Sequence, residues 1–164
     1  MQTALTAVRA LLYGAGFIYL WWWIAGWVKR FDTAIGIPVP EWSMAPGVVL
    51  MIAGGLLGLA CVGTFVVRGQ GTAAPFDAPR KFVAIGPYRY VRNPMYIGGW
   101  AVLIGYGLYD QSVSIILFSL LWFLLFQFFV IFVEEKGLEN RFGESYRNYK
   151  NSVGRWIPRL KSND

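Results

Sequence analysis

Histidine is absent from the 164-residue chain, and cysteine occurs only once. Without histidine, the chain lacks the commonest general base, the usual zinc ligand and the partner that activates serine or cysteine nucleophiles. Hydrolase and metalloprotease functions therefore lose most of their support, and we expect no metal site. The lone cysteine, Cys61, excludes an intrachain disulfide and is expected to be structural, because it lies inside an apolar run.

Charged residues are also scarce, at 15% of the chain, whereas 56% of the residues are hydrophobic and the mean hydropathy is +0.45. This composition is too apolar for an ordinary soluble protein. It predicts an all-α integral membrane protein, a single domain over residues 1–164. About four transmembrane helices are expected, in these apolar runs: 4–28, 46–67, 94–109 and 112–133.

The third run is shorter than the roughly 20 residues that a membrane-spanning helix needs, so it is expected to form a short hairpin with the fourth. Asp110 or Ser112 can cap the fourth helix. The first run has no Ala-x-Ala-like cleavage site, which favours a retained helix. Four tryptophans near its end are expected to anchor it at the membrane interface: Trp21, Trp22, Trp23 and Trp27.

Glycines at short spacing predict close helix packing, with a cofactor or lipid tail approaching the backbone as the alternative. Gly54 and Gly58 form a GxxxG pair in the second run. The third run contains four more glycines: Gly98, Gly99, Gly105 and Gly107.

The formal net charge is +6, and twelve of the fifteen lysines and arginines fall either between the second and third runs or after the fourth. A four-helix topology places both segments on one side of the membrane, which argues against nucleic acid binding. By the positive-inside tendency this side is cytoplasmic. We therefore expect an inner or plasma membrane protein with both termini in the cytoplasm, although Lys29 and Arg30 oppose this orientation weakly.

Polar residues crowd the start of the third run, in the sequence AIGPYRYVRNPMYIGGW at 84–100. Asn93 and Pro94 suit the cap and the first turn of a helix, which explains the boundary. The tyrosines and arginines around them need another explanation. Taken alone, this stretch fits interface anchors and headgroup contacts as well as it fits a functional site.

Two adjacent carboxylates, Glu134 and Glu135, directly follow the fourth run. Neighbours on a helix point about 100° apart, so one carboxylate is expected to face the bundle and the other to meet water. A buried carboxylate needs a cation or several hydrogen-bond donors. Because the third and fourth helices are antiparallel neighbours, Glu134 is predicted to return to the level of Asn93 and Tyr96.

Apolar and aromatic residues then recur at spacings of three and four, which predicts a C-terminal cytosolic amphipathic helix. Gly143 in its middle would permit close approach, so that the helix folds back over the mouth of the bundle. The Trp-Ile-Pro sequence at 156–158 is expected to end it with an interface anchor and a stop. The aromatic stripe consists of Leu138, Phe142, Tyr146, Tyr149 and Val153.

The segments GPYRYVRNPMYIGG and EEKGLENRFGESYRNYKNSVGRWIPR together resemble the isoprenylcysteine carboxyl methyltransferase family of integral membrane enzymes, over about 79–159. Phospholipid N-methyltransferases are similar over 93–96 and over the two glutamates. The resemblance implies a methyltransferase that uses S-adenosylmethionine, yields S-adenosylhomocysteine and has no Rossmann domain. Its cofactor would bind at the cytosolic face, and a lipid-like or small amphiphilic substrate would enter from the bilayer.

The resemblance also implies which residues surround the cofactor. Glu134 would pair with the cofactor's amino group, and Arg92 and Glu135 would lie just behind the site. No catalytic residue is assigned, since transfer of an activated methyl group needs close approach and a dry site more than a proton shuttle. The implied cofactor-binding residues are Arg80, Lys81, Phe82, Val83, Tyr88, Asn93, Pro94, Met95, Tyr96 and Glu134.

Two departures from the family leave the acceptor open. Asn93 stands where carboxyl methyltransferases commonly have histidine, and Val130 stands where the eukaryotic enzymes have an arginine one helical turn before the glutamate. An isoprenylcysteine carboxylate is the first expectation, with a phospholipid amine or a thiol as alternatives. A non-catalytic membrane scaffold and a relative of NADPH-binding membrane reductases are further alternatives.

Overall fold

The computed structural model describes residues 2–69 and 82–159, and every regular element in these ranges is a helix, as the composition predicts. The four long helices are α1 (Gln2–Lys29), α3 (Met44–Thr64), α4 (Pro94–Tyr109) and α5 (Val113–Phe129). Shorter α-helices are α2 (Asp32–Ile35), α6 (Glu135–Phe142) and α7 (Glu144–Ser152). The 3-10 helices are η1 (Glu41–Ser43) and η4 (Gly86–Arg89), and π-helical turns extend α3 as η2 (Phe65–Gly69) and α5 as η5 (Val130–Glu134).

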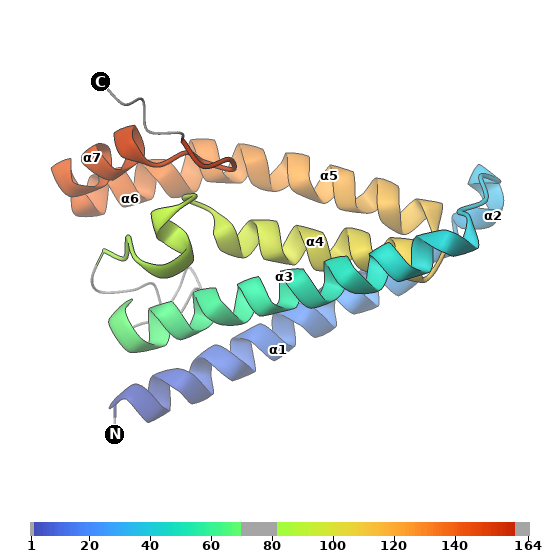
Figure 1. The fold of residues 1–164 in the computed structure, drawn as a ribbon, viewed down its shortest axis with the longest axis horizontal. Coiled ribbons are helices and arrows are strands. Elements are labelled where there is room, and N and C mark those ends of the chain that lie inside the picture. Colours follow the sequence, from blue (N-terminus) through green and yellow to red (C-terminus); the bar gives the residue numbers. More distant parts are fainter. Residues whose placement is uncertain (1, 70–81, 160–164) are drawn as a thin grey trace.

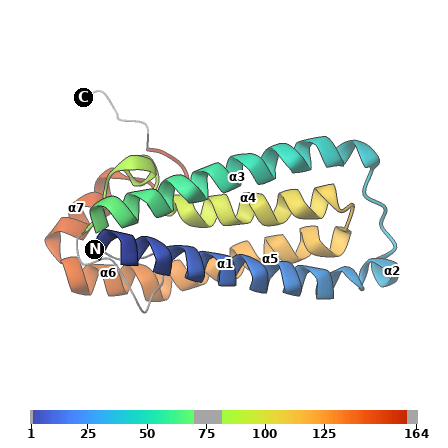
Figure 2. The ribbon, with the colours of Figure 1, turned by 90° about the horizontal axis from the view of Figure 1, so that it is seen from below.

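The long helices run side by side along the length of the molecule (Figure 1). The view turned by 90° shows the same arrangement, with α2 and the turn between α4 and α5 at one end (Figure 2). At the opposite end lie α6, α7, the segment before α4 and the start of α1 (Figure 1). The bundle therefore brings the two polar segments of the sequence to the same end.

Within the described residues, three helical stretches are long and apolar enough to cross a membrane: Val8–Lys29, Glu41–Val67 and Val113–Phe142. The α4 helix has 16 residues and the bounds predicted from the sequence, and it pairs with α5 as the expected short hairpin. A membrane protein with three such stretches is confirmed, and a fourth span by α4 stays a prediction.

Glycines allow α3 and α4 to approach each other backbone to backbone. A Cβ on Gly54 would lie 2.5 Å from the carbonyl oxygen of Gly98, and Gly47 and Gly105 approach each other in the same way at 2.7 Å. Close packing is thus confirmed. The second contact on α3 comes from Gly47, however, whereas a Cβ on Gly58 would meet no atom within 4 Å.

An aromatic cluster joins α1 to the hairpin of α4 and α5. The ring of Trp21 packs against Trp122 and Phe126 of α5, with centroids 5.8 and 6.2 Å apart. The prediction that Trp21 anchors the helix at the interface is therefore wrong, because its ring lies inside the bundle. The exposed rings of Trp22 and Trp23 face outward, as anchors would.

Polar side chains hold the end with α2 together. Ser112 caps α5 as predicted, because its hydroxyl accepts a hydrogen bond from the Ile115 N–H at 3.2 Å. Asp110 pairs with Lys29 at 2.8 Å, and Asp32 accepts from the Ser114 N–H at 2.8 Å. Burial acts to raise the pKa of Asp32, but hydrogen bonds from Ser114 and Ser112 outweigh it, so this pKa lies below its usual value. Asp32 is thus stabilised as an anion.

The predicted C-terminal amphipathic helix is divided into α6 and α7 at Gly143. Gly143 has φ 55° and ψ −126°, a conformation that favours glycine strongly, and a Cβ there would have open space. The glycine is needed for the bend, and the expectation that it permits a close approach is wrong. The aromatic stripe does pack inward, since Phe82 lies 5.4 Å from Phe142 and 5.1 Å from Tyr149 between ring centroids.

Replacing Gly54 with alanine is expected to lower the free energy of unfolding by about 1–3 kcal/mol, because the methyl group would force α3 and α4 apart. The matched control is Gly55→Ala, whose Cβ would have open space on the same helix and which is expected to be neutral or slightly stabilising. Thermal unfolding in detergent measures both. Equal melting temperatures for the two variants would contradict this packing.

Candidate functional site

The centre of the candidate site is a hydrogen bond between α4 and the junction of α5 with α6. The Tyr96 hydroxyl donates to Glu134 Oε2 at 2.7 Å. Tyr96 lies in the first turn of α4, and Glu134 ends the π-helical turn η5, a feature that is frequent at functional sites. The predicted convergence of the two polar segments in one layer is confirmed.

Among the residues that the structure describes, no lysine or arginine forms an ion pair with Glu134. Its carboxylate is half-buried, and Tyr96 is its one hydrogen-bond partner among the described residues. Aromatic rings pack around Tyr96 itself, with Phe126 at 5.1 Å and Trp122 and Trp156 at 6.4 Å between centroids. A carboxylate in such apolar surroundings favours a cationic partner.

Glu135, in contrast, has several cationic partners and only 4% exposure. Arg155 donates to both of its carboxylate oxygens, at 2.7 and 2.9 Å, and Arg92 approaches it to 3.1 Å. Lys150 lies 3.7 Å from the second oxygen. The expectation that one of the two glutamates meets water is therefore wrong, because arginines from two other segments enclose Glu135.

The segment after α7 lies along the segment before α4. The Arg92 N–H donates to the Gly154 carbonyl at 2.8 Å, and the Asn93 N–H donates to the Arg155 carbonyl at 3.3 Å. The Asn93 side chain also donates to the Arg155 carbonyl, at 3.4 Å, and makes no capping bond to α4. Asn93 therefore occupies the cap position of α4, as predicted, but its side chain bonds to the segment after α7 and not to the helix. Gly154 is required here, since any Cβ would collide with the Ile157 carbonyl.

Tyr88, in η4, links the segment before α4 to α7 and to the end of α3. It is buried, its ring lies 5.0 Å from that of Phe65, and its carbonyl accepts from the Tyr149 hydroxyl at 2.6 Å. Burial, followed by the neighbouring Cys61 thiol, raises the pKa of Tyr88 well above its usual value. Burial and the adjacent Tyr146 likewise raise the pKa of Tyr149. Both phenols therefore act as hydrogen-bond donors and not as bases at neutral pH.

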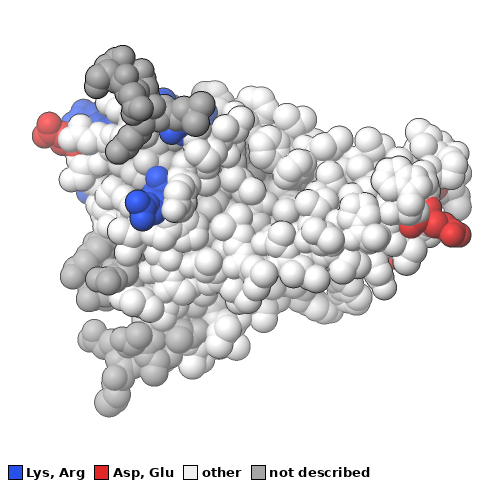
Figure 3. All heavy atoms as spheres, in the orientation of Figure 1, with Lys and Arg blue, Asp and Glu red and all other residues white. Residues whose placement is uncertain are grey.

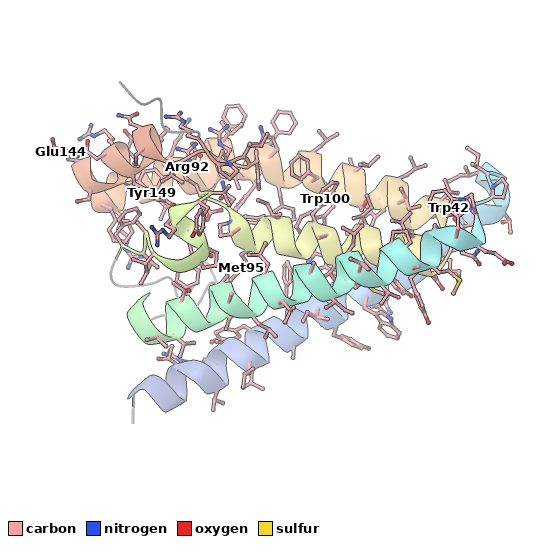
Figure 4. The ribbon with its side chains drawn as sticks, in the orientation of Figure 1. Trp42, Arg92, Met95, Trp100, Glu144 and Tyr149 are labelled. Atoms are coloured by element: carbon pink, nitrogen blue, oxygen red, sulfur yellow. The ribbon has the colours of Figure 1, made fainter. Side chains whose placement is uncertain are left out.

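The structure brings some of the implied cofactor-binding residues into direct contact and places others nearby or in the interior. Tyr96 and Glu134 are in contact, Pro94 is fully buried, and Met95 is half-buried beside them. Val83 is buried. Figure 4 shows Arg92, Met95 and Tyr149 at the same end of the bundle, far from Trp42. Arg80 and Lys81 lie outside the described residues.

Several structural partners of this layer were not predicted from the sequence. Arg155 and Tyr149 hold α7 and the segment after it, residues 144–159, in place, and we call this part the tail. Trp156 donates through its indole to the Gln127 side chain of α5. Trp156 is half-buried, and its ring packs against those of Tyr96 and Phe123. It therefore contacts the bundle, whereas an interface anchor was expected. The sequence shows Trp156 two residues before Pro158, but it does not indicate that Gln127 is the hydrogen-bond partner of this tryptophan.

The fold and the site define a helical membrane protein with a polar layer at one end of its bundle, and comparison with known proteins gives its family. A model of the phospholipid methyltransferase family matches residues 42–145, and the chain belongs to this family.

A curated relative shows the predicted resemblance to isoprenylcysteine carboxyl methyltransferases, and a solved structure shares the fold. The chain is 35% identical over 115 residues to the protein-S-isoprenylcysteine O-methyltransferase of Schizosaccharomyces pombe, across 62% of this chain and 48% of that protein. A solved structure of the eukaryotic intramembrane Ras methyltransferase, isoprenylcysteine carboxyl methyltransferase, superposes with a TM-score of 0.63 at 22% identity. That match covers 87% of this chain and 52% of the other. The chain thus spans about half the length of these relatives.

Replacing Glu135 with glutamine is expected to lower the free energy of unfolding by about 3–5 kcal/mol, because it leaves the buried Arg92 guanidinium without a counterion. Glu139→Gln is the matched control, since among the described residues Glu139 forms an ion pair with Lys150 alone, at 3.6 Å near the surface, and should change stability by at most about 1 kcal/mol. Chemical unfolding in detergent measures both variants. A Glu135 variant as stable as the control would show that the ion pairs do not hold the tail.

Proposed function

We propose that the chain is an integral membrane methyltransferase that uses S-adenosylmethionine to methylate a lipid-like acceptor. The observation that carries this proposal is the Tyr96–Glu134 pair, a half-buried carboxylate that has a hydrogen-bond donor but no cation among the described residues. Membership of the phospholipid methyltransferase family and the two isoprenylcysteine methyltransferase relatives support the same function.

The residues present fit the proposed cofactor. S-adenosylmethionine carries an ammonium and a sulfonium charge, and Glu134 offers the unmatched negative charge for the ammonium. The aromatic rings around Tyr96, and Phe82 at the inner face of α6 and α7, offer surfaces for an adenine ring or a sulfonium. Tyr88, Asn93, Pro94 and Met95 would complete the site together with Val83, Arg80 and Lys81.

The bound cofactor would supply an activated methyl group, so for a carboxylate acceptor, which is already anionic, this chain need supply no acid or base; an amine or a thiol would first have to lose a proton. The chain's own residues bind, orient and exclude water. The hydrogen bond from Tyr96 fixes the Glu134 carboxylate, and the tail held by Arg155 and Tyr149 covers the end of the bundle. Exclusion of water strengthens the electrostatic attraction within such a site. A chain without histidine is therefore consistent with this function.

An isoprenylcysteine carboxylate is the acceptor that we propose first, with a phospholipid amine or a thiol as alternatives. Three indole nitrogens are buried without a hydrogen-bond partner in the described part of the chain, and two of them, Trp100 Nε1 and Trp122 Nε1, belong to the hairpin of α4 and α5. Trp122 also packs on Tyr96, so oxygen atoms of an acceptor beside the site could satisfy these donors. Val130 is fully buried and supplies no cation for a carboxylate, which keeps the alternatives open.

The end of the bundle with the site is proposed to face the cytoplasm. Lysine and arginine side chains gather at that end, and the surface between the two ends is bare of charge in this view (Figure 3). The start of α1 and the C-terminal helix α7 lie there as well (Figure 1). This distribution follows the positive-inside tendency for a protein of an inner or plasma membrane.

Replacing Glu134 with glutamine is expected to weaken S-adenosylmethionine binding about 10- to 100-fold, since a hydrogen bond to a charged group is worth about 1.5–3 kcal/mol. Calorimetric titration of the purified chain measures this affinity, with the exposed Glu144→Gln as the control. Wild-type affinity in the Glu134 variant would refute the role of Glu134. Binding of NADPH in place of S-adenosylmethionine would favour a reductase relative, and binding of neither would favour a scaffold.

The acceptor is tested by methyl transfer from labelled S-adenosylmethionine in lipid nanodiscs. We expect the label to appear in a prenylcysteine analogue, as a base-labile ester, in preference to an aminophospholipid or a small thiol. Glu134→Gln should reduce transfer to every acceptor, because it acts on the cofactor. Transfer mainly to the amine or the thiol would replace the proposed acceptor while leaving the methyltransferase function in place.

A further inference from the structure

A cavity lies between α7 and the segment that follows it. Its volume is about 630 Å³, and it opens to the surface. Among its lining residues are Arg92, Lys150, Arg155 and Arg159, together with Trp156 and Ile157. Neither Tyr96 nor Glu134 lines it, so this cavity is separate from the centre of the methyltransferase site.

The cavity carries an excess of positive charge. Four basic side chains line it, whereas only two carboxylates, Glu135 and Glu139, form ion pairs with them among the described residues. Arg159 donates to the Asn151 carbonyl and forms none of these ion pairs. Two positive charges are therefore left for an anion, and arginine suits phosphate because its planar group offers several donors.

Arg92 points to a ligand independently of the charge count. Its side chain is only 7% exposed, and its Nε atom is buried without a hydrogen-bond partner within the described residues. Its two other nitrogens are engaged, one by Glu135 at 3.1 Å and one by the Lys150 carbonyl at 3.4 Å. A buried arginine with an unused donor is costly unless a further group completes its hydrogen bonding.

Apolar side chains stand next to these cations. Ile157 is 78% exposed, the highest exposure among the large hydrophobic residues described, and it follows Trp156 at the rim of the cavity. The cavity is lined by α7 and the segment after it, which lie at the end of the bundle where basic side chains gather (Figures 1 and 3). This position corresponds to the boundary between hydrocarbon and headgroups.

We propose that this cavity binds the phosphate group of an anionic membrane lipid, with the acyl chains lying against Ile157 and the apolar surface of the bundle. The phosphate interacts with Arg159 and Lys150 and lies near the buried Arg92. Trp156 separates the two sites, because it lines the cavity and packs on Tyr96. The bound lipid is distinct from the methyl acceptor and stabilises the tail that covers the methyltransferase site.

The test is native mass spectrometry of the full chain in detergent, with added phosphatidylglycerol or diacylglycerol as probes. We expect retention of phosphatidylglycerol and little retention of diacylglycerol, which has the same tails without the phosphate. A parallel titration adds inorganic phosphate to the phosphatidylglycerol complex. Displacement at phosphate concentrations similar to those of the lipid would overturn the lipid as the occupant and leave a soluble phosphate ligand.

The variants are Arg159→Gln and the double variant Lys150→Gln with Arg159→Gln. A basic residue near an anionic lipid contributes about fivefold in affinity, so we expect about fivefold weaker retention for the first and about 25-fold for the second. Arg147→Gln is the control, because Arg147 is exposed on α7 and does not line the cavity. Equal retention by all the variants, or equal retention of both lipids, would overturn the proposal.

A folding defect is separated by measuring the melting temperature of each variant without added lipid. The Arg159 variant is expected to melt with the wild type, because Arg159 lies outside the buried ion pairs. Added phosphatidylglycerol should then raise the melting temperature of the wild type and the Arg147 variant more than that of the Arg159 variant. Equal increases in all three would contradict a site at this cavity.

Discussion

Burial of the Glu135 carboxylate is the constraint on which the functional end of this protein depends. A charge at 4% exposure needs partners, and they come from the segment before α4, as Arg92, and from the segment after α7, as Arg155. Neither segment has a long helix to position it. The ion pairs therefore join two irregular segments to the bundle. With the segments aligned in this way, the backbone N–H groups of Arg92 and Asn93 donate to carbonyls of the segment after α7.

This constraint also separates the roles of the two adjacent glutamates. Arg92, Lys150 and Arg155 form ion pairs with Glu135. Among the described residues, Glu134 therefore has only the Tyr96 hydroxyl as a hydrogen-bond partner, next to aromatic rings. One carboxylate stabilises the fold, and the other is available for a cationic ligand. Two neighbouring residues of one sequence motif thus differ in function because of their surroundings rather than their chemistry.

The long-range part of this arrangement could be predicted from the sequence because helix geometry determines it. Pro94 determines where α4 begins, and an antiparallel hairpin brings Glu134 back to Tyr96. The ion pair between Glu135 and Arg155 could not be predicted, since Arg155 lies 20 residues further along the chain, beyond the bend at Gly143 and the end of α7. The bend at Gly143 was missed for a related reason, because it depends on how the aromatic stripe meets Phe82. Helical periodicity carries no information about either contact.

The central claim is that the Tyr96–Glu134 layer and the tail that covers it form a site for S-adenosylmethionine. Ultraviolet cross-linking of the full chain with methyl-labelled S-adenosylmethionine, followed by peptide mapping, tests it most directly. Label is expected in peptides that contain residues 82–96 and 134–149. Excess unlabelled cofactor should abolish this labelling. Specific label confined to the opposite end, near Asp32 and Asp110, would contradict the claim.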